Sequence, residues 1–247
     1  MKIVVSGKGG VGKTTFSGTL ARIFSDRGYR IIAVDSDPSM NLHASLGMEN
    51  PRPIIEFRDL ISERTAISPG IYNLKPEVSD IVDRYSSKRE NIKLIVMGTV
   101  EEAGGGCVCP ENTFLRALLR HIVVKRGEFV ILDTEAGLEH LGRGTAKKFD
   151  IMIVMVEPSN KAVETANRIQ VLSKQIGIRR VYAVGNKVKS KEQEDYITAN
   201  TDFDVLGFIP LDEAVIEADM QNRPLYDHDS IALDAIKGLS KKIEETT

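Results

Sequence analysis

Short apolar runs rich in Val and Ile alternate with longer stretches of amphipathic spacing along the chain. Strands buried on both faces of a parallel sheet have few charged positions, whereas helices carry an apolar stripe at intervals of three and four residues. The alternation predicts right-handed strand–helix–strand units, and hence an α/β fold with a doubly wound, mostly parallel β-sheet flanked by helices. The expected strands are 2–5, 30–34, 94–97, 129–132, 151–156, 181–184 and 205–209, and the clearest expected helices are 14–27, 111–125 and 162–175.

Two segments differ from this regular pattern. Residues 51–90 contain four prolines and many charges, so we expect an insertion with short helices inside one domain that spans residues 1–247. Residues 231–243 carry an apolar stripe but no aromatic anchor, and acidic residues follow the stripe. This composition favours a helix packed on the core over one that lies on a membrane.

Composition narrows the classes of partner. The net charge of −2 gives no electrostatic reason to expect nucleic acid or an anionic membrane as the main partner. The most apolar run, 151–156, is too short to span a bilayer, and the first residues lack the apolar length of a signal peptide. We therefore expect a cytoplasmic protein.

A glycine-rich loop follows the first expected strand. Its glycines let the backbone close around phosphates, and the amides of Gly9, Gly10, Val11 and Gly12 can donate to them. Lys13 would neutralise the charge of the β- and γ-phosphates, and the Thr14 hydroxyl would bind Mg²⁺. The loop, Gly7-Lys8-Gly9-Gly10-Val11-Gly12-Lys13-Thr14, fits the phosphate-loop pattern G-x-x-x-x-G-K-[ST] and predicts ATP or ADP with Mg²⁺ as cofactors.

The same loop allows a second interpretation. The spacing of Gly7, Gly9 and Gly12 also matches a dinucleotide fingerprint, and Asp35 lies about where a ribose-binding acid would be. The alternative is therefore an NAD-binding oxidoreductase. Lys13 and Thr14 favour a nucleoside triphosphate, because a dinucleotide turn has no need of a lysine at the start of its helix.

Carboxylates follow two further expected strands. Asp35 and Asp37 come at the end of the second strand, where a carboxylate near the γ-phosphate could polarise the attacking water. Either could instead cap a helix expected at 39–46. Asp133 ends an apolar strand, as in a Walker B motif, and would hold Mg²⁺ through water. The carboxyl ends of parallel strands share one edge of the sheet, so these groups should converge.

Lys8 is the unusual residue of the phosphate loop, because without anions it would repel Lys13. The segment Lys8–Thr15 resembles the deviant Walker A motif of the ATPase group that includes MinD, ParA and the nitrogenase iron protein. The resemblance implies that Lys8 reaches across a nucleotide-bound homodimer to the phosphates of the partner subunit. It also implies that Thr15 helps to hold the α-phosphate.

The same resemblance assigns roles to the switch residues. Asp37 would be the hydrolytic residue, Asp35 would order the magnesium shell, and the Gly137 amide would sense the γ-phosphate. Adenine would contact Asn186 and Lys187, together with the backbone near Pro210 and Leu211. Guanine selection lacks its residue, because Lys189 stands where that selection needs an acid.

Two cysteines, Cys107 and Cys109, follow three glycines. A disulfide between residues so close would form a strained ring, whereas two thiolates are half of a tetrahedral S₄ metal site. A two-fold dimer would supply the pair twice and close a Cys₄ site between subunits. Thiolate chemistry does not by itself choose the metal, and Zn²⁺ is one ion that suits a tetrahedral S₄ site.

With the cysteine segment 104–112 included, the chain resembles the nickel-insertion accessory ATPases of carbon monoxide dehydrogenase. This resemblance implies an ATP-hydrolysing metallochaperone that holds Ni²⁺ or Zn²⁺ at Cys107 and Cys109. It also implies a homodimer formed on ATP or metal binding, with carbon monoxide dehydrogenase as the client enzyme. An iron–sulfur cluster carrier or reductase on the same scaffold stays open as an alternative.

Overall fold

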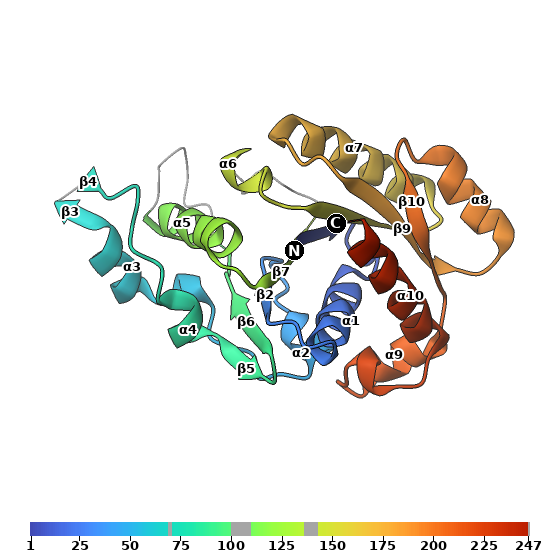
Figure 1. The fold of residues 1–247 in the computed structure, drawn as a ribbon, viewed down its shortest axis with the longest axis horizontal. Helices are drawn as coiled ribbons and strands as arrows, with labels where there is room; N and C mark the ends of the chain where they lie inside the picture. Colours follow the sequence, from blue (N-terminus) through green and yellow to red (C-terminus); the bar gives the residue numbers. More distant parts are fainter. Residues whose placement is uncertain (69–70, 100–109, 136–142, 247) are drawn as a thin grey trace.

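A computed structural model of the chain describes residues 1–68, 71–99, 110–135 and 143–246. Its main sheet has eight strands in the order β10-β9-β8-β1-β7-β2-β6-β5, and every neighbouring pair is parallel except β5 with β6 (Figure 1). This arrangement confirms the predicted fold class. The strands are β1 (Lys2–Gly7), β2 (Ile31–Asp35), β5 (Ser87–Arg89), β6 (Ile92–Val96), β7 (Phe129–Asp133), β8 (Ile151–Val156), β9 (Val181–Val188) and β10 (Val205–Pro210).

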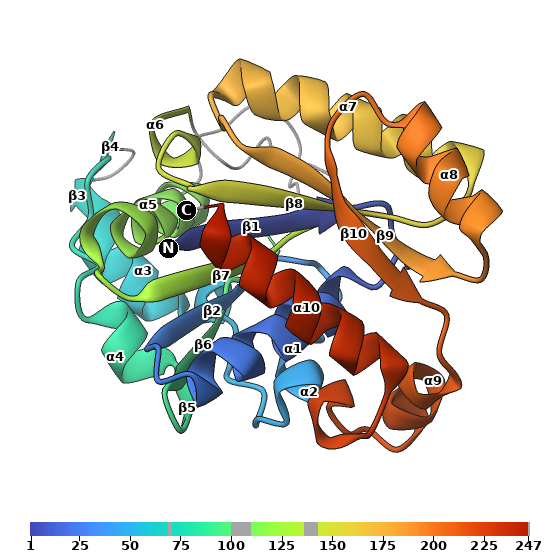
Figure 2. The same cartoon turned by 45° about the vertical axis from the view of Figure 1, so that its right-hand side comes forward.

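Helices cover both faces of the sheet (Figures 1 and 2). Neighbouring residues of a strand point to opposite faces, so Val4 belongs to one apolar cluster while Ile3 and Val5 belong to another. The cluster with Val4 packs under α3, α4, α5, α6, α7 and α8, and the cluster with Val5 packs under α1, α2 and α10. The helices are α1 (Lys13–Asp26), α2 (Leu42–Leu46), α3 (Arg58–Thr65), α4 (Ile81–Tyr85), α5 (Pro110–Lys125), α6 (Arg143–Ala146), α7 (Asn160–Ile176), α8 (Lys191–Asn200), α9 (Glu213–Met220) and α10 (Ile231–Glu245).

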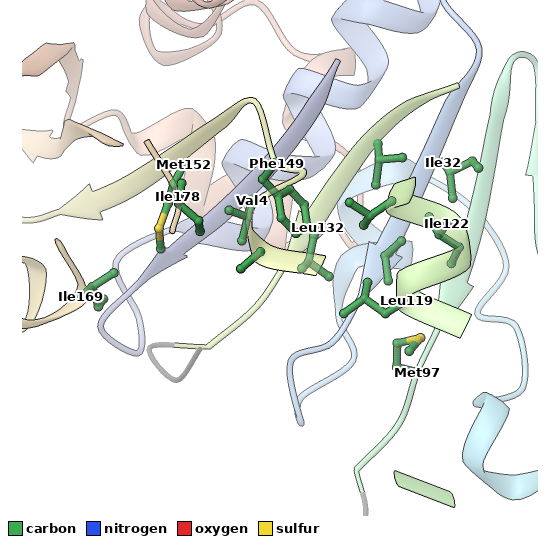
Figure 3. Packing of buried hydrophobic residues seen from close by; sticks show 14 of the residues in the cluster. Val4, Ile32, Met97, Leu119, Ile122, Leu132, Phe149, Met152, Ile169 and Ile178 are labelled. Carbon is green, nitrogen blue, oxygen red and sulfur yellow. The ribbon is translucent and has the colours of Figure 1, made fainter. Parts of the chain in front are cut away.

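Figure 3 shows how the first cluster fills the space between the sheet and its helices. Leu132 of β7 lies between Val4 of β1 and the α5 side chains Leu119 and Ile122, and all four side chains are fully or almost fully buried. Burial of this kind stabilises the fold by roughly 25 cal/mol for each Å² of apolar surface. The core therefore fixes the central strands, whose carboxyl ends carry the candidate site.

The expected strands and helices are found with small shifts at their ends, except at β9. The expected strand 181–184 continues to Val188 because β10 pairs with it further along, with Phe208 opposite Gly185 and Pro210 opposite Val188. Between these pairs β9 has one more residue than β10, which is a bulge, and Lys187 there has a left-handed φ of 58°. Asn186 and Lys187 therefore lie within a strand, not after it as the sequence suggested.

The irregular segment 51–90 contains the short helices that its composition predicted. They are a 3₁₀ turn (Ile54–Glu56), α3 and α4, and a small hairpin of β3 (Ala66–Ser68) and β4 (Ile71–Tyr72) lies between α3 and α4. Ile54 and Ile81 join the same apolar cluster as the central strands, and β5 extends the main sheet at its edge. The insertion thus packs on the common core.

The last helix, α10, lies against α1 on the sheet (Figure 2). Its apolar stripe from Leu233 to Ile243 is buried, which confirms the prediction of a core-packed helix, although Ile231 at its start is exposed. In the part of the chain that the structure describes, every helix is too short or too polar to cross a bilayer.

Candidate nucleotide site

The predicted site residues meet at one edge of the sheet because their strands are neighbours. Strand β7 lies between β1 and β2, and Asp133 is in register with Val5 on one side and Asp35 on the other. The next strand, β6, pairs with β2 and places Val96 beside Asp35. The phosphate loop and the carboxylates at the ends of β2 and β7 therefore share one edge, as the motif positions predicted.

The phosphate loop depends on glycine at its last turn. Gly12, directly before α1, has a left-handed φ of 92°, and a Cβ atom there would collide with the side-chain amide of Asn186. A side chain at this position would be strained for both reasons. The loop therefore passes close to β9, with no room for another side chain between them.

Two side chains from the bulge of β9 hold the carbonyl groups of the loop. The Asn186 side-chain amide donates to the Val11 carbonyl at 2.7 Å, and the Lys187 ammonium donates to the Gly10 carbonyl at 2.6 Å. The C=O and N–H of one trans peptide point in opposite directions, so this contact turns the Gly12 N–H away from Asn186. A loop with its amides turned this way can bind phosphate oxygens.

Lys13 lies inside the loop and is almost fully buried. Its ammonium is 3.5 Å from the Lys8 carbonyl and 3.8 Å from a carboxylate oxygen of Asp37. Partial burial by itself would raise the pKa of Asp37. The hydrogen bonds from Ser39 and the positive charge of Lys13 outweigh this effect, so the pKa of Asp37 is lowered. Asp37 is thus a charged group beside Lys13, as a residue that polarises water should be.

Asp133 is completely buried and fits a cation site. The Ser17 hydroxyl donates to its Oδ1 at 3.1 Å, and the Thr14 side chain also lies beside this carboxylate. Burial, more than any other cause, raises the pKa of Asp133 to about 7; the charge of Asp35 acts in the same direction, and Thr14, Lys13 and Ser17 act against it. A divalent cation near Thr14 would offset both effects, because its charge stabilises the ionised carboxylate. The oxygen ligands available here are those that Mg²⁺ prefers.

Asp35 has a structural role that the sequence left open. One of its oxygens accepts from the Leu42 amide at 2.9 Å, and the other accepts from the Asp37 amide at 3.1 Å. Leu42 is the first residue of α2, so Asp35 satisfies an amide at the start of this helix. Burial raises the pKa of Asp35 to about 6, although these two amides lower it. Asp35 therefore connects the end of β2 to α2.

Lys8 is paired within its own chain. Its ammonium lies 3.2 Å from Oε1 of Glu157, which directly follows β8, and Lys187 lies 3.9 Å from the other oxygen of Glu157. The side chain of Lys8 remains 37% exposed, so it can reach other groups when this pair opens. The sequence analysis missed Glu157, because a single glutamate after a strand matches no motif.

A pocket of about 390 Å³ opens beside the loop. Asn186, Lys187, Pro210 and Leu211 line it, together with Gly12. The structure thus brings together the four residues that we expected near adenine. Gly10 and Thr15, which we expected near the phosphates, also line it. The rest of the wall is mainly apolar and was not predicted: it comprises Phe16, Ile209, Val215, Ile216, Leu225, Ala232 and Ile236, with Asp212 and Asp219 as its acids.

Three predicted residues, Cys107, Cys109 and Gly137, lie outside the described residues. Within the described ranges, no group of three or more His, Cys, Asp and Glu side chains could hold a metal ion. Ser17 is a further residue of the site that the sequence analysis missed. A serine inside an amphipathic helix gives no signal by itself, although its place three residues after Thr14 turns it toward the end of β7.

The chain is similar in sequence to known nucleotide-binding proteins. Residues 2–225 match the sequence profile described as the CobQ/CobB/MinD/ParA nucleotide binding domain. The chain is 43% identical over 236 residues to the carbon monoxide dehydrogenase accessory protein CooC of Rhodospirillum rubrum, covering 92% of this chain and 90% of CooC. It is also 43% identical over 233 residues to an uncharacterized ATP-binding protein of Methanocaldococcus jannaschii, covering 91% of each.

Solved structures share the fold at low sequence identity. MinD of Pyrococcus horikoshii in complex with Mg-ADP superposes with a TM-score of 0.71 at 20% identity, over 99% of this chain and 96% of that one. A ParA family ATPase of Chlorobium tepidum superposes with a TM-score of 0.73 at 18% identity, over 97% of each chain. These similarities confirm the architecture of the sheet and its helices.

Proposed function

The chain belongs to the CobQ/CobB/MinD/ParA family of nucleotide-binding proteins and is an ATPase, and we propose that it is a metallochaperone that supports nickel insertion into carbon monoxide dehydrogenase. The observation that carries the proposal is the similarity to CooC along almost the whole chain. The Cys107-x-Cys109 pair supports it, because a thiolate pair is suited to bind a soft or borderline metal ion.

The phosphate loop would bind the triphosphate through its amides and Lys13. Gly9, Gly10, Val11 and Gly12 would donate to the phosphates, Thr15 would contact the α-phosphate, and Lys13 would neutralise the β- and γ-phosphates. Asn186 and Lys187, with Pro210 and Leu211, would enclose adenine in the adjoining pocket. An NAD-binding oxidoreductase is disfavoured by the family and by the lysine that faces Asp37 inside the loop.

Hydrolysis needs a base near the γ-phosphate and a cation. Asp37 would orient and polarise the attacking water, and its lowered pKa keeps it ionised for this task. Thr14, Asp35 and Asp133 would hold Mg²⁺ directly or through water, and the cation would neutralise charge that develops on the phosphates. The Gly137 amide would sense the γ-phosphate and move when it is released.

Dimer formation would connect nucleotide state to metal binding. Lys8 would leave Glu157 and contact the phosphates bound to a second copy of the chain. In this homodimer the two Cys107-x-Cys109 pairs would form one Cys₄ site for Ni²⁺ or Zn²⁺. Closing with ATP would set the distances between the four sulfurs, and hydrolysis would open the site for release of the metal to the client enzyme.

Metal content per chain, measured together with native mass in the presence of ATP or ADP, tests this proposal. We expect half a Ni²⁺ or Zn²⁺ per chain, in the dimer only, and loss of the metal in the variant Cys107→Ala/Cys109→Ala with nucleotide binding retained. One metal per dimer that persists in this variant would contradict the shared site. Anaerobic absorbance of the wild type is the control, because an iron–sulfur cluster would favour the alternative function.

A further inference from the structure

A second, basic hollow lies at the opposite edge of the sheet from the phosphate loop. It measures about 360 Å³ and is lined by Lys147, Lys174, Gly177, Ile178 and Arg179. Lys147 directly follows α6, and Lys174 belongs to the last turn of α7, so the hollow lies where α6 meets the end of α7 (Figures 1 and 2). The segments that form it precede β8 and β9, and therefore lie at the amino-terminal ends of these strands.

The backbone positions the first of these cations. Gly177 ends α7 with a left-handed φ of 95°, and a Cβ atom there would lie 2.7 Å from Cγ of Lys147. The aliphatic part of Lys147 therefore packs directly on the glycine, which places its charge beside the end of α7. A side chain at position 177 would displace it.

The cations of the hollow have no acidic partner in the described part of the chain. Among the residues that the structure describes, no carboxylate lines the hollow, and Lys147, Lys174 and Arg179 form neither an ion pair nor a side-chain hydrogen bond. Elsewhere on the surface, Lys93 and Arg126 converge on Asp83 and are paired by it. Three like charges gathered without a counterion repel each other, and an anionic ligand would relieve this repulsion.

An apolar side chain continues the hollow along α7. Arg168, Val171 and Lys174 are spaced by three residues, so they lie on the same face of the helix. Val171 is 50% exposed, although it is a large apolar residue. The surface thus offers charge in the hollow and an apolar contact one turn away.

We propose that this basic hollow binds an acidic segment of a partner protein, with carboxylates against Lys147, Lys174 and Arg179 and an apolar side chain against Val171. A membrane would require several apolar side chains able to insert, and nucleic acid would require cations spaced along a phosphate backbone. A compact cluster with one apolar neighbour fits an acidic peptide better than either. The site is remote from the phosphate loop, so nucleotide and peptide bind together without competing.

Two fluorescent peptides test the proposal on the full chain: one of glutamate only, and one in which glutamate alternates with leucine. We expect anisotropy to show binding of both, with tighter binding of the mixed peptide. The variant Lys147→Glu/Lys174→Glu/Arg179→Glu should weaken binding by about tenfold or more and leave ATPase activity unchanged. Val171→Ser should remove the preference for the mixed peptide.

The matched control is Lys75→Glu/Lys88→Glu/Lys241→Glu, which makes the same change of charge at exposed lysines that form no ion pair with the described residues. This control should change the peptide affinity by less than about twofold. Equal weakening in both triple variants would overturn the proposal, as would a wild type that binds neither peptide. Phosphatidylglycerol vesicles or duplex DNA that bind through the same three residues, while the peptides do not, would overturn it in favour of those ligands.

Discussion

The ammonium of Lys8 lies 3.2 Å from a carboxylate oxygen of Glu157 in the same chain. In the proposed dimer Lys8 would contact the phosphates of a partner subunit, and the two contacts would exclude each other. Glu157 also lies 3.9 Å from Lys187, which holds the Gly10 carbonyl of the phosphate loop. The contact made by Lys8 therefore distinguishes a subunit on its own from the proposed dimer.

Glu157→Gln should favour the dimer. The change removes the charge that holds Lys8 within its own chain. A partly exposed ion pair of this kind stabilises the contact by about 0.2–1 kcal/mol. Each dimer would open two such pairs, so we expect dimerisation with ATP to strengthen by roughly two- to thirtyfold, measured by analytical ultracentrifugation. Glu164→Gln, on the next helix, is the control and should not change the dimer. A weaker dimer in Glu157→Gln would contradict the exchange of contacts.

Lys8→Ala should separate hydrolysis from binding. A cation supplied to the phosphates of a partner acts mainly in the transition state, so turnover should fall by roughly 10³-fold. The affinity for ATP, measured by equilibrium binding, should change much less. Lys13→Ala provides the comparison and should lose both properties. Unchanged turnover in Lys8→Ala would remove the argument for contact with the phosphates of a partner.

Asn186→Ala should reveal whether this residue orients the loop or selects the base. Its amide donates to the Val11 carbonyl, and loss of one such hydrogen bond costs about 1 kcal/mol. If the loop contact dominates, ADP and GDP should both bind several-fold more weakly, and by the same factor. A loss confined to ADP would instead show that Asn186 reads adenine. Asn167→Ala, on the outer surface of α7, is the control for both measurements.

Ser17→Ala should weaken the response to Mg²⁺. Ser17 is a positioning residue that fixes one oxygen of the buried Asp133 carboxylate. Loss of such a partner typically weakens metal binding by 10–100-fold, so the Mg²⁺ concentration for half-maximal nucleotide binding should rise by roughly tenfold or more. Nucleotide affinity without Mg²⁺ should not change. The control is Ser25→Ala in the same helix, α1. It removes a buried hydroxyl that has no hydrogen-bond partner among the described residues.

Asp83→Asn should destabilise the protein at neutral pH and not in acid. Hydrogen bonds from Arg126 and Lys93 hold the pKa of Asp83 far below its usual range. A carboxyl group whose pKa is lowered by folding stabilises the folded state at pH values above its ordinary pKa of about 4. This stabilisation is lost as the pH falls toward the pKa of the group in the folded state. Because Asp83 is half exposed, solvent screens these pairs, and we expect a loss of about 1 kcal/mol or less at pH 7.

Urea unfolding at neutral and acidic pH would measure this difference. The free energies of unfolding of the wild type and Asp83→Asn should approach each other as the pH falls below about 4. Asp204→Asn is the control, because this exposed carboxylate forms no ion pair in the described structure. A difference that grows in acid would contradict the assignment of the low pKa to Asp83.

The sequence by itself determined the fold class and the centre of the candidate site. Buried parallel strands need continuous apolar runs, and the phosphate loop and its strand-end carboxylates are contiguous motifs, so local order in the chain carries this information. Since the carboxyl ends of neighbouring parallel strands share an edge, the positions of the motifs alone place Lys13, Asp35 and Asp133 together, as the order of the strands confirms.

Only the tertiary structure decided which side chains hold that centre in place. Glu157 meets Lys8 across 149 positions, Asn186 meets Val11 across 175, and Ser17 meets Asp133 across 116. None of these pairs has a fixed spacing, because each depends on the order of strands in the sheet and on the bulge in β9. The basic hollow is similar, since Lys147 and Arg179 become neighbours only when α6 packs against the end of α7. Contacts of this kind arise from the packing of distant segments, and a local pattern cannot encode them.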